Sequence, residues 1–253
     1  MTSLNMYDLG ALEKNWFQQK FEVRSFLSLH PKLFFPLVKI AGKNPCQAVG
    51  KHTELVIEGF PRSANSFSIG AFQSAQPRRI ALASHLHAPA QIIRATHLNI
   101  PTLVLIRKPV DAVVSLRCLE LETNYLSSSR NPALDIPLEK YFSNWISFYT
   151  RIMPYRSRYV VGLFDEVTQD FGRIIEKINQ QFDTNFTIFN HTKQNVEKVH
   201  KEQGFHSGPS KKRQFLKQIV RQELESDEIK FMINKANAIY YQFEIFAGKY
   251  FFY

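Results

Sequence analysis

The sequence is poor in cysteine and in acidic side chains, and it has no long apolar run. Only two of its 253 residues are cysteines, Cys46 and Cys118. They form neither a zinc-binding spacing nor a disulfide framework, so we expect no metal site and a reducing, cytoplasmic location. The most apolar early run, at 33–42, is too short to span a bilayer, so we expect no transmembrane segment. The N-terminal stretch meets charges early, unlike a secretory signal.

Phenylalanine and positive charge are abundant instead. The 22 Phe residues and a hydrophobic fraction of 44% indicate a folded core rather than a disordered chain. Lysine and arginine outnumber aspartate and glutamate by 32 to 22, which gives a formal net charge of +10. This balance favours an anionic partner, such as nucleic acid, an acidic membrane surface or a phosphorylated small molecule.

Short apolar runs alternate with helical patterns through the middle of the chain. The run at 101–106 is uninterrupted, as in a strand buried within a parallel sheet. We therefore predict a three-layer α/β fold, in which a parallel sheet is flanked by helices. Strands are expected at 53–58, 78–84, 101–106 and 158–164, and helices at 65–75, 88–98, 110–122, 137–151 and 167–182.

The flanking segments complete this organisation. Residues 11–42 look helical, with breaks near Pro31 and Pro36, residues 123–136 look polar and loop-like, and residues 191–214 are polar and basic. We expect a single domain over 1–253, made of an N-terminal helical extension to about 45, a nucleotide-binding core at about 53–182, and C-terminal helices within about 211–247. Ligands of such sheets bind at the carboxyl ends of the strands.

The first of these ends carries EGFPRSANSF, residues 58–67. A glycine after a strand, with small residues opening a helix, favours a nest of backbone N–H groups that binds phosphate. Compared with the Walker A pattern, Ala64 replaces the second glycine and Asn65 replaces the lysine. The loop is therefore suited to hold a phosphate but poorly equipped to cleave ATP. The alternative is a turn in which Gly59 and Pro61 serve the backbone alone.

A second unusual segment is IRKPVDAVVS, residues 106–115. Arg107 follows the buried strand, and Ser115 lies eight residues later, about two turns into the next helix. Both side chains can converge on one phosphate, the arginine through its charged fork and the serine through its hydroxyl. Asp111 suits a helix cap. The alternative is a solvated Arg107 and an ordinary helical Ser115.

Together the two segments resemble the sulfotransferase family over about 53–182. GFPRSANSF is similar to its 5′-phosphosulfate-binding loop, and IRKPVDAVVS to its 3′-phosphate-binding segment. The resemblance implies a P-loop-like fold and an enzyme that moves a sulfuryl group, without a metal, from 3′-phosphoadenosine 5′-phosphosulfate (PAPS) to a hydroxyl or amine. It also implies a cosubstrate site made of Arg62, Ser63, Ala64, Asn65, Ser66, Phe67, Arg107 and Ser115, with Phe67 stacked on adenine.

The resemblance also implies the catalytic groups. His85, in ASHLHAP, matches the family's histidine base, with His87 and His97 as competitors; His97 precedes a strand and so falls at the wrong edge. Arg62 would stabilise the charge that grows on the bridging oxygen as the sulfur–oxygen bond breaks. Phe164, in LFDEV, stands where the family has a tyrosine, so a hydroxyl contact is lost.

Two features depart from the family. Ala64 stands where glycine is usual, and the family's C-terminal Arg-Lys-Gly segment is absent as such. HSGPSKKRQF, at 206–215, is expected either to replace that segment, with Lys211 and Arg213 near the 3′-phosphate, or to be a solvated basic loop.

Two other function classes stay open. A nucleotide-dependent kinase on the same scaffold needs a clamping lysine that Asn65 replaces. A non-catalytic basic module that binds nucleic acid or anionic lipid would explain the charge but not two phosphate loops, so we expect no nucleic-acid partner. We expect the acceptor to be a small molecule, a carbohydrate or a lipid, and its site to be walled by the polar loop at 123–136 and the helix at 137–151, with Tyr141, Trp145 and Tyr149. The sequence does not indicate an oligomeric state.

Overall fold

The computed structural model describes residues 6–40, 47–126, 134, 136–204 and 211–248. Four parallel strands form one sheet in the order β2-β1-β3-β4. They are β1 (Leu55–Gly59), β2 (Leu82–Ser84), β3 (Thr102–Ile106) and β4 (Val160–Leu163). β3 and β1 are central and wholly buried, which agrees with their continuous apolar sequences.

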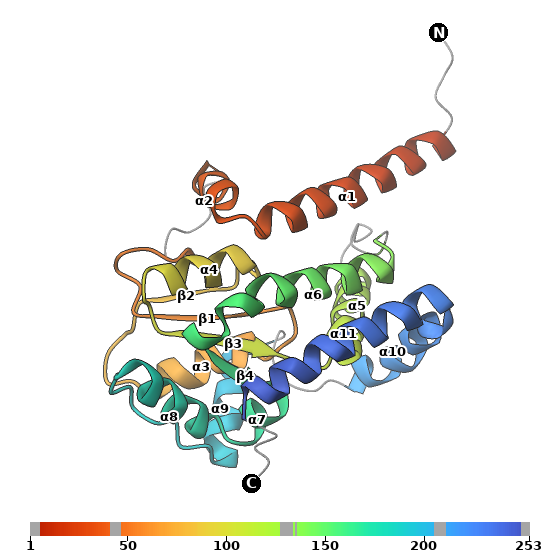
Figure 1. The fold of residues 1–253 in the computed structure, drawn as a ribbon. Coiled ribbons are helices and arrows are strands. Elements are labelled where there is room, and N and C mark those ends of the chain that lie inside the picture. The colour runs from red at the N-terminus through yellow and green to blue at the C-terminus, as the bar shows by residue number, and fades with distance from the viewer. Residues whose placement is uncertain (1–5, 41–46, 127–133, 135, 205–210, 249–253) are drawn as a thin grey trace.

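Helices cover both faces of this sheet (Figure 1). α3 (Asn65–Ala75), α8 (Phe171–Phe182) and α9 (Lys193–Gln203) lie on one face, and α4 (Pro89–His97), α5 (Pro109–Leu126), α6 (Leu138–Ile152) and α11 (Asp227–Phe246) on the other. Successive side chains of a strand point to opposite faces. Leu103 and Leu105 therefore join one hydrophobic cluster, while Val104 and Ile106 join the other. The predicted three-layer α/β architecture is confirmed.

The N-terminal segment forms two helices, α1 (Met6–Ser28) and α2 (Pro31–Ile40). Pro31 begins α2, where its missing N–H is not needed. The predicted break at Pro36 is wrong, because Pro36 lies inside α2 on its exposed side, where solvent can satisfy the carbonyl that loses its donor. α1 rests on α6, with the rings of Phe21 and Tyr141 5.2 Å apart.

The predicted element boundaries need three further corrections. β2 is shorter than the expected strand at 78–84. The helix expected at 167–182 is divided into α7 (Phe164–Gln169) and α8 at Asp170, whose side chain accepts a hydrogen bond from Arg173 N and caps α8. The polar and basic stretch at 191–214, for which no helix before 211 was predicted, contains α9, which is so polar that only Val199 among its residues is buried.

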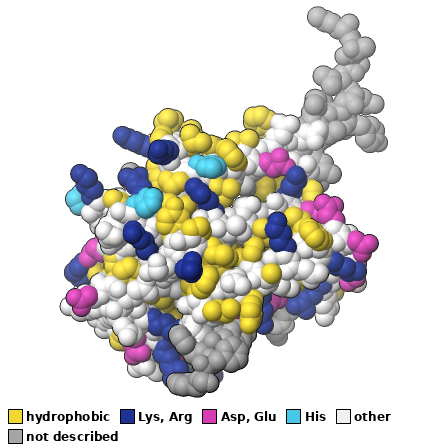
Figure 2. All heavy atoms as spheres, in the orientation of Figure 1, with side chains coloured by type: hydrophobic (Ala, Val, Ile, Leu, Met, Phe, Trp, Pro, Cys, Tyr) yellow, Lys and Arg dark blue, Asp and Glu magenta, His cyan; other side chains and the backbone are white. Residues whose placement is uncertain are grey.

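The C-terminal helices are α10 (Lys211–Gln222) and α11, joined by a short 3-10 turn, η5 (Glu223–Glu225). A second such turn, η3 (Met153–Arg158), leads into β4. α10 packs on α5, and α11 packs on α6. None of the described helices is both long and apolar enough to cross a membrane. Lys and Arg side chains are scattered over the face shown in Figure 2.

Candidate active site

The loop between β1 and α3 starts from a rigid base. A side chain at Gly59 would bring a Cβ atom to 2.3 Å from the carbonyl oxygen of Leu105, so only glycine lets β1 and β3 approach this closely. The buried Tyr149 hydroxyl donates to that same oxygen at 2.8 Å and accepts from Phe60 N at 3.2 Å. Asn65 Nδ2 donates to Phe60 O at 3.1 Å. The residue in the place of the Walker lysine therefore stabilises the loop itself.

The tip of the loop has a strained backbone that opens the N-terminus of α3. Arg62 and Ala64 have left-handed φ angles of 68° and 72°. Ala64 is the N-cap residue of α3, and it offers no side-chain acceptor to the first turn. The uncapped N–H groups and the positive end of the helix dipole suit an anion. Among the described residues, the buried Ser63 Oγ and Asn65 Oδ1 also have no hydrogen-bond partner of normal geometry.

The left-handed conformation of Ala64 predicts a stabilising substitution. An L-residue other than glycine costs about 1–2 kcal/mol in this region, while glycine adds entropy to the unfolded chain. We expect Ala64→Gly to raise the free energy of unfolding by about 0.5–1 kcal/mol, measured by urea denaturation. Ala71→Gly, a buried helical position in α3, is the control and should lower it. A loss of stability in Ala64→Gly would contradict the strain.

Two arginines meet beside this loop. Arg62 Nε donates to Ser115 Oγ at 3.1 Å, and Arg107 Nη1 donates to Arg62 O at 3.2 Å. The guanidinium of Arg107 lies 4.0 Å from the ring centroid of Phe164. The sequence predicted that Ser115 would share a phosphate with Arg107; the structure joins Ser115 to Arg62 and so brings all three residues into one site.

The electrostatics of this pair favour an anionic ligand. Burial, with added repulsion from Arg213 and Arg107, lowers the pKa of Arg62 to about 10. Burial also lowers the pKa of Arg107. Cations that are desolvated and close to one another are stabilised by any anion that binds between them.

The remaining residues predicted to bind the cosubstrate are buried or lack a described side chain. Arg213 is buried in an ion pair with Glu122. Phe67 is 5% exposed and packs against Phe171 and His200, with ring centroids 6.1 and 5.4 Å away. Lys211 begins α10, but its side chain lies outside the described part of the chain.

His85 lies in the loop between β2 and α4, next to the first turn of α3. Its Nε2 is 3.4 Å from Ser66 Oγ, and its Nδ1 is 3.3 Å from Ser84 Oγ. Either hydroxyl can donate or accept, so both tautomers of the imidazole are allowed. The side chain is exposed, and its backbone has a left-handed φ of 61°. The structure thus brings the predicted base to the predicted phosphate loop.

The two competing histidines have different surroundings. His87 Nδ1 lies 2.8 Å from Gly59 O, so this nitrogen must carry the proton and donate it. His87 thereby ties the β2–α4 loop to the end of β1. His97 is the last residue of α4, and its ring lies 5.6 Å from that of Tyr155, before the amino end of β3.

Sequence reasoning missed Glu58, the carboxyl group beneath the histidine loop. It is fully buried in β1, and it accepts hydrogen bonds from Leu86 N at 3.1 Å and Gln91 Nε2 at 3.0 Å. Its other oxygen is 3.6 Å from His87 Nδ1. Burial raises the pKa of Glu58 to about 8. A lone glutamate in the apolar run LVIEG was the available signal, because an unpaired carboxylate is rarely buried without a role.

The predicted acceptor wall is wrong for the helix at 137–151, and most of the loop at 123–136 lies outside the described residues. Tyr141, Trp145 and Tyr149 belong to the hydrophobic core between the sheet and α6, with exposed fractions of 3%, 0% and 0%. Their spacing along α6 places them on its inward face, where they pack against the sheet and α11. Among the described residues, no group of three or more His, Cys, Asp or Glu side chains is arranged to hold a metal ion.

Comparisons with known proteins show similarity to a solved structure but to no protein family. No protein-family model matches the sequence, and a search of the curated proteins found no relative. Among solved structures, the chain is similar to mouse sulfotransferase SULT7A1 complexed with PAP. The sequence identity is 14% and the TM-score is 0.43, over 78% of this chain and 84% of the other.

Proposed function

We propose that this protein is a sulfotransferase that uses PAPS and transfers its sulfuryl group to a hydroxyl or amine acceptor. The observation that carries the proposal is the meeting of two half-buried arginines, Arg62 and Arg107, with the uncapped N-terminus of α3. An elongated polyanion can place one negative charge at the loop and another beside Arg107. The donor set fits such a group, because it consists of backbone N–H groups, guanidinium groups and hydroxyls.

Different residues would bind different parts of the cosubstrate. The backbone of 63–66 and the Ser66 hydroxyl would bind the 5′-phosphosulfate, and Arg107 and Ser115 the 3′-phosphate. Phe67 is proposed for the adenine side, where its ring is 5% exposed and lies 5.4 Å from that of His200. Phe164 would support Arg107, and Lys211 and Arg213 would add positive charge near the 3′-phosphate.

When bound, PAPS supplies a sulfuryl group attached to a phosphate leaving group. The residues of this chain must therefore bind and orient the two substrates and remove one proton from the acceptor. His85 would accept that proton from the attacking hydroxyl or amine, since its ring is exposed beside the loop. Arg62 would stabilise the negative charge that develops on the leaving oxygen. The hydrogen bond from Arg62 to Ser115 fixes the position of the Arg62 guanidinium before the ligand binds.

Calorimetric titration with 3′,5′-adenosine bisphosphate (PAP), the desulfated product, tests the proposal. We expect binding in EDTA, and a loss of about 10–100-fold in affinity for Arg107→Ala, because charged hydrogen bonds of this kind contribute about 1.5–3 kcal/mol. Arg173→Ala is the matched control, since Arg173 is an exposed arginine of α8 paired within its own helix, and its affinity should be unchanged. Binding of Mg-ATP but not PAP would indicate a kinase instead, and binding of neither would leave a basic binding module.

A further inference from the structure

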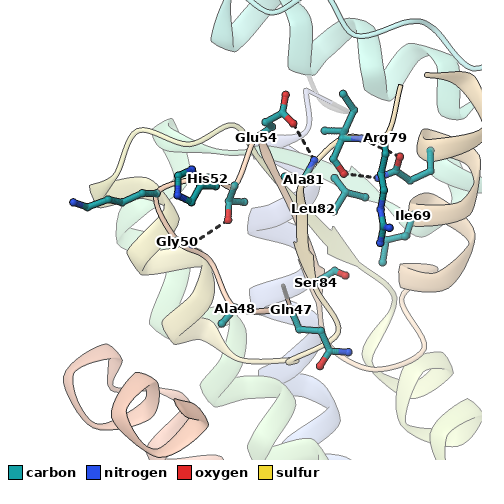
Figure 3. Close-up of a pocket in the computed structure, with 14 residues that line it drawn as sticks. Gln47, Ala48, Gly50, His52, Glu54, Ile69, Arg79, Ala81, Leu82 and Ser84 are labelled. Atoms are coloured by element: carbon teal, nitrogen blue, oxygen red, sulfur yellow. Dashed lines mark hydrogen bonds between the residues drawn. The ribbon is translucent and has the colours of Figure 1, made fainter. Parts of the chain in front are cut away.

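We propose that a cavity of about 960 Å³ beside β2 is the acceptor site, and that the acceptor is an elongated alcohol or phenol with an apolar body and an anionic group at the end remote from its hydroxyl. The assignment of the cavity to the acceptor depends on the proposed function. Its volume is within the range of small-molecule pockets. Figure 3 shows the residues that line it.

The walls of the cavity come from three segments. β2 is an edge strand of the described sheet, so one of its sides faces the cavity through Ala81, Leu82 and Ser84. Ile69 and Gln73 of α3 form a second wall, and the segment at 47–54 before β1 forms the third. Most of the surface these residues offer to the cavity comes from carbon atoms, including those of Ile69, Ile80 and Leu82, which fits an apolar body better than a sugar.

One end of the cavity adjoins the proposed reaction centre. Ser84 lines the cavity, and its Oγ is 3.3 Å from His85 Nδ1. Ser66 occupies the same face of α3 as Ile69 and Gln73, three and seven residues before them, and its Oγ is 3.4 Å from His85 Nε2. An acceptor lying along this face therefore has its leading end next to the proposed base and the phosphate loop.

The opposite end is positively charged. Arg79 lies before β2, at the end remote from Ser84, and Lys51 and His52 belong to the segment before β1; all three line the cavity and are exposed. Glu54 is the acidic residue among the described lining residues, but Arg78 binds its carboxylate at 2.5 Å and Ala81 N donates to it at 3.0 Å. Because Glu54 is already neutralised, Lys51 and Arg79 leave a net positive charge that an anionic substituent can meet.

The distance between the two ends sets the length of the acceptor. Seven residues of α3 separate Ser66 from Gln73, which corresponds to about 10 Å along the helix axis. The far end is rigid, because the Gln73 side chain donates to Ile80 O at 2.7 Å and accepts from Ile80 N at 3.3 Å. A hydroxyl beside His85 and an anion beside Arg79 must therefore lie at opposite ends of one extended molecule.

A matched pair of probes tests this inference. 6-Hydroxy-2-naphthoate carries a hydroxyl and a carboxylate at opposite ends of a rigid apolar body, and 2-naphthol is the same body without the carboxylate. In equilibrium binding followed by the fluorescence of the probe, we expect the naphthoate to bind at least about 10-fold more tightly than 2-naphthol. Arg79→Gln should reduce this preference to about 2-fold or less, while Arg173→Gln should leave it intact.

A substitution that fills the cavity tests the acceptor site independently of the cosubstrate site. Leu82→Trp should weaken naphthoate binding about 10-fold or more while PAP affinity, measured by calorimetry, stays as in the wild type. Equal binding of the two probes, or naphthoate binding that Leu82→Trp leaves unchanged, would overturn the acceptor assignment. PAP binding without any naphthoate binding would overturn the inference and leave the proposed function standing. Naphthoate binding at this cavity without PAP binding would remove the proposed function, and with it the assignment of the ligand as a sulfuryl acceptor.

Discussion

Replacement of His85 by Asn is expected to lower kcat for PAPS-dependent sulfation by about 10²–10⁴-fold, the range typical of a lost general base. The asparagine amide would keep a hydrogen bond to Ser84 or Ser66, so the loop should hold its shape, but it cannot accept a proton from the acceptor. PAP affinity should stay within about 2-fold of the wild type, because a base that acts only in the transition state adds little to binding of the product. The measurement is PAP release from PAPS with the better of the two naphthyl acceptors.

His87→Asn distinguishes a base from a structural histidine. The His87 Nδ1 proton is committed to Gly59 O, so this variant should lose stability and affect turnover far less than His85→Asn. A large kcat loss in His87→Asn, with His85→Asn near wild type, would transfer the base role to His87. Loss of PAP binding in His85→Asn would show that His85 supports the loop rather than the proton transfer.

Glu58→Ala is expected to lower the free energy of unfolding by about 3 kcal/mol or more. The substitution leaves a cavity beneath the β2–α4 loop and removes the acceptor of two buried donors, Leu86 N and Gln91 Nε2. Because these contacts hold the histidine loop, Glu58 is a positioning residue for His85. Urea denaturation measures the effect, and Glu58→Gln should retain more of the stability than Glu58→Ala.

Glu58 also predicts a pH dependence of stability. Its pKa rises from 4.5 to about 8 on folding, so between these values the folded protein holds a proton that the unfolded chain has lost. The contribution of Glu58 is therefore fully present below about pH 4.5 and is lost as the pH rises through about 8, with a slope of at most about 1.4 kcal/mol per pH unit. Glu58→Gln should remove the contribution of Glu58 to this slope.

The control for that slope is Glu120. Burial raises its pKa to about 7, so Glu120 adds a decline in stability of the same sign that ends at lower pH. Glu120→Gln should therefore leave the part of the slope between about pH 7 and 8 in place, and Glu58→Gln should not. A slope between about pH 7 and 8 that survives in Glu58→Gln would mean that the Glu58 carboxyl is ionised in the folded protein.

The positions of the main elements followed from local sequence. The continuous apolar run at 101–106 and the glycine and small residues at 59–66 signal β3 and the first phosphate loop within a few residues of chain. α9 escaped prediction because its sequence is almost wholly polar, and its one buried residue, Val199, packs against α3. Tyr149 and Trp145 were misassigned because an aromatic stripe at helical spacing looks the same whether it faces a core or a ligand.

The sequence by itself determined the alternation of strands and helices, and it located the two loops proposed to bind phosphate and the histidine between them, because these are read from neighbouring residues. Only the tertiary structure decided how they meet. The bond from Arg62 to Ser115 joins residues 53 positions apart, that from Leu86 N to Glu58 joins residues 28 apart, and that from Tyr149 to Leu105 O joins residues 44 apart. Such contacts depend on how the strands and helices pack, and so does the cavity beside β2, which exists because β2 is the edge of the described sheet.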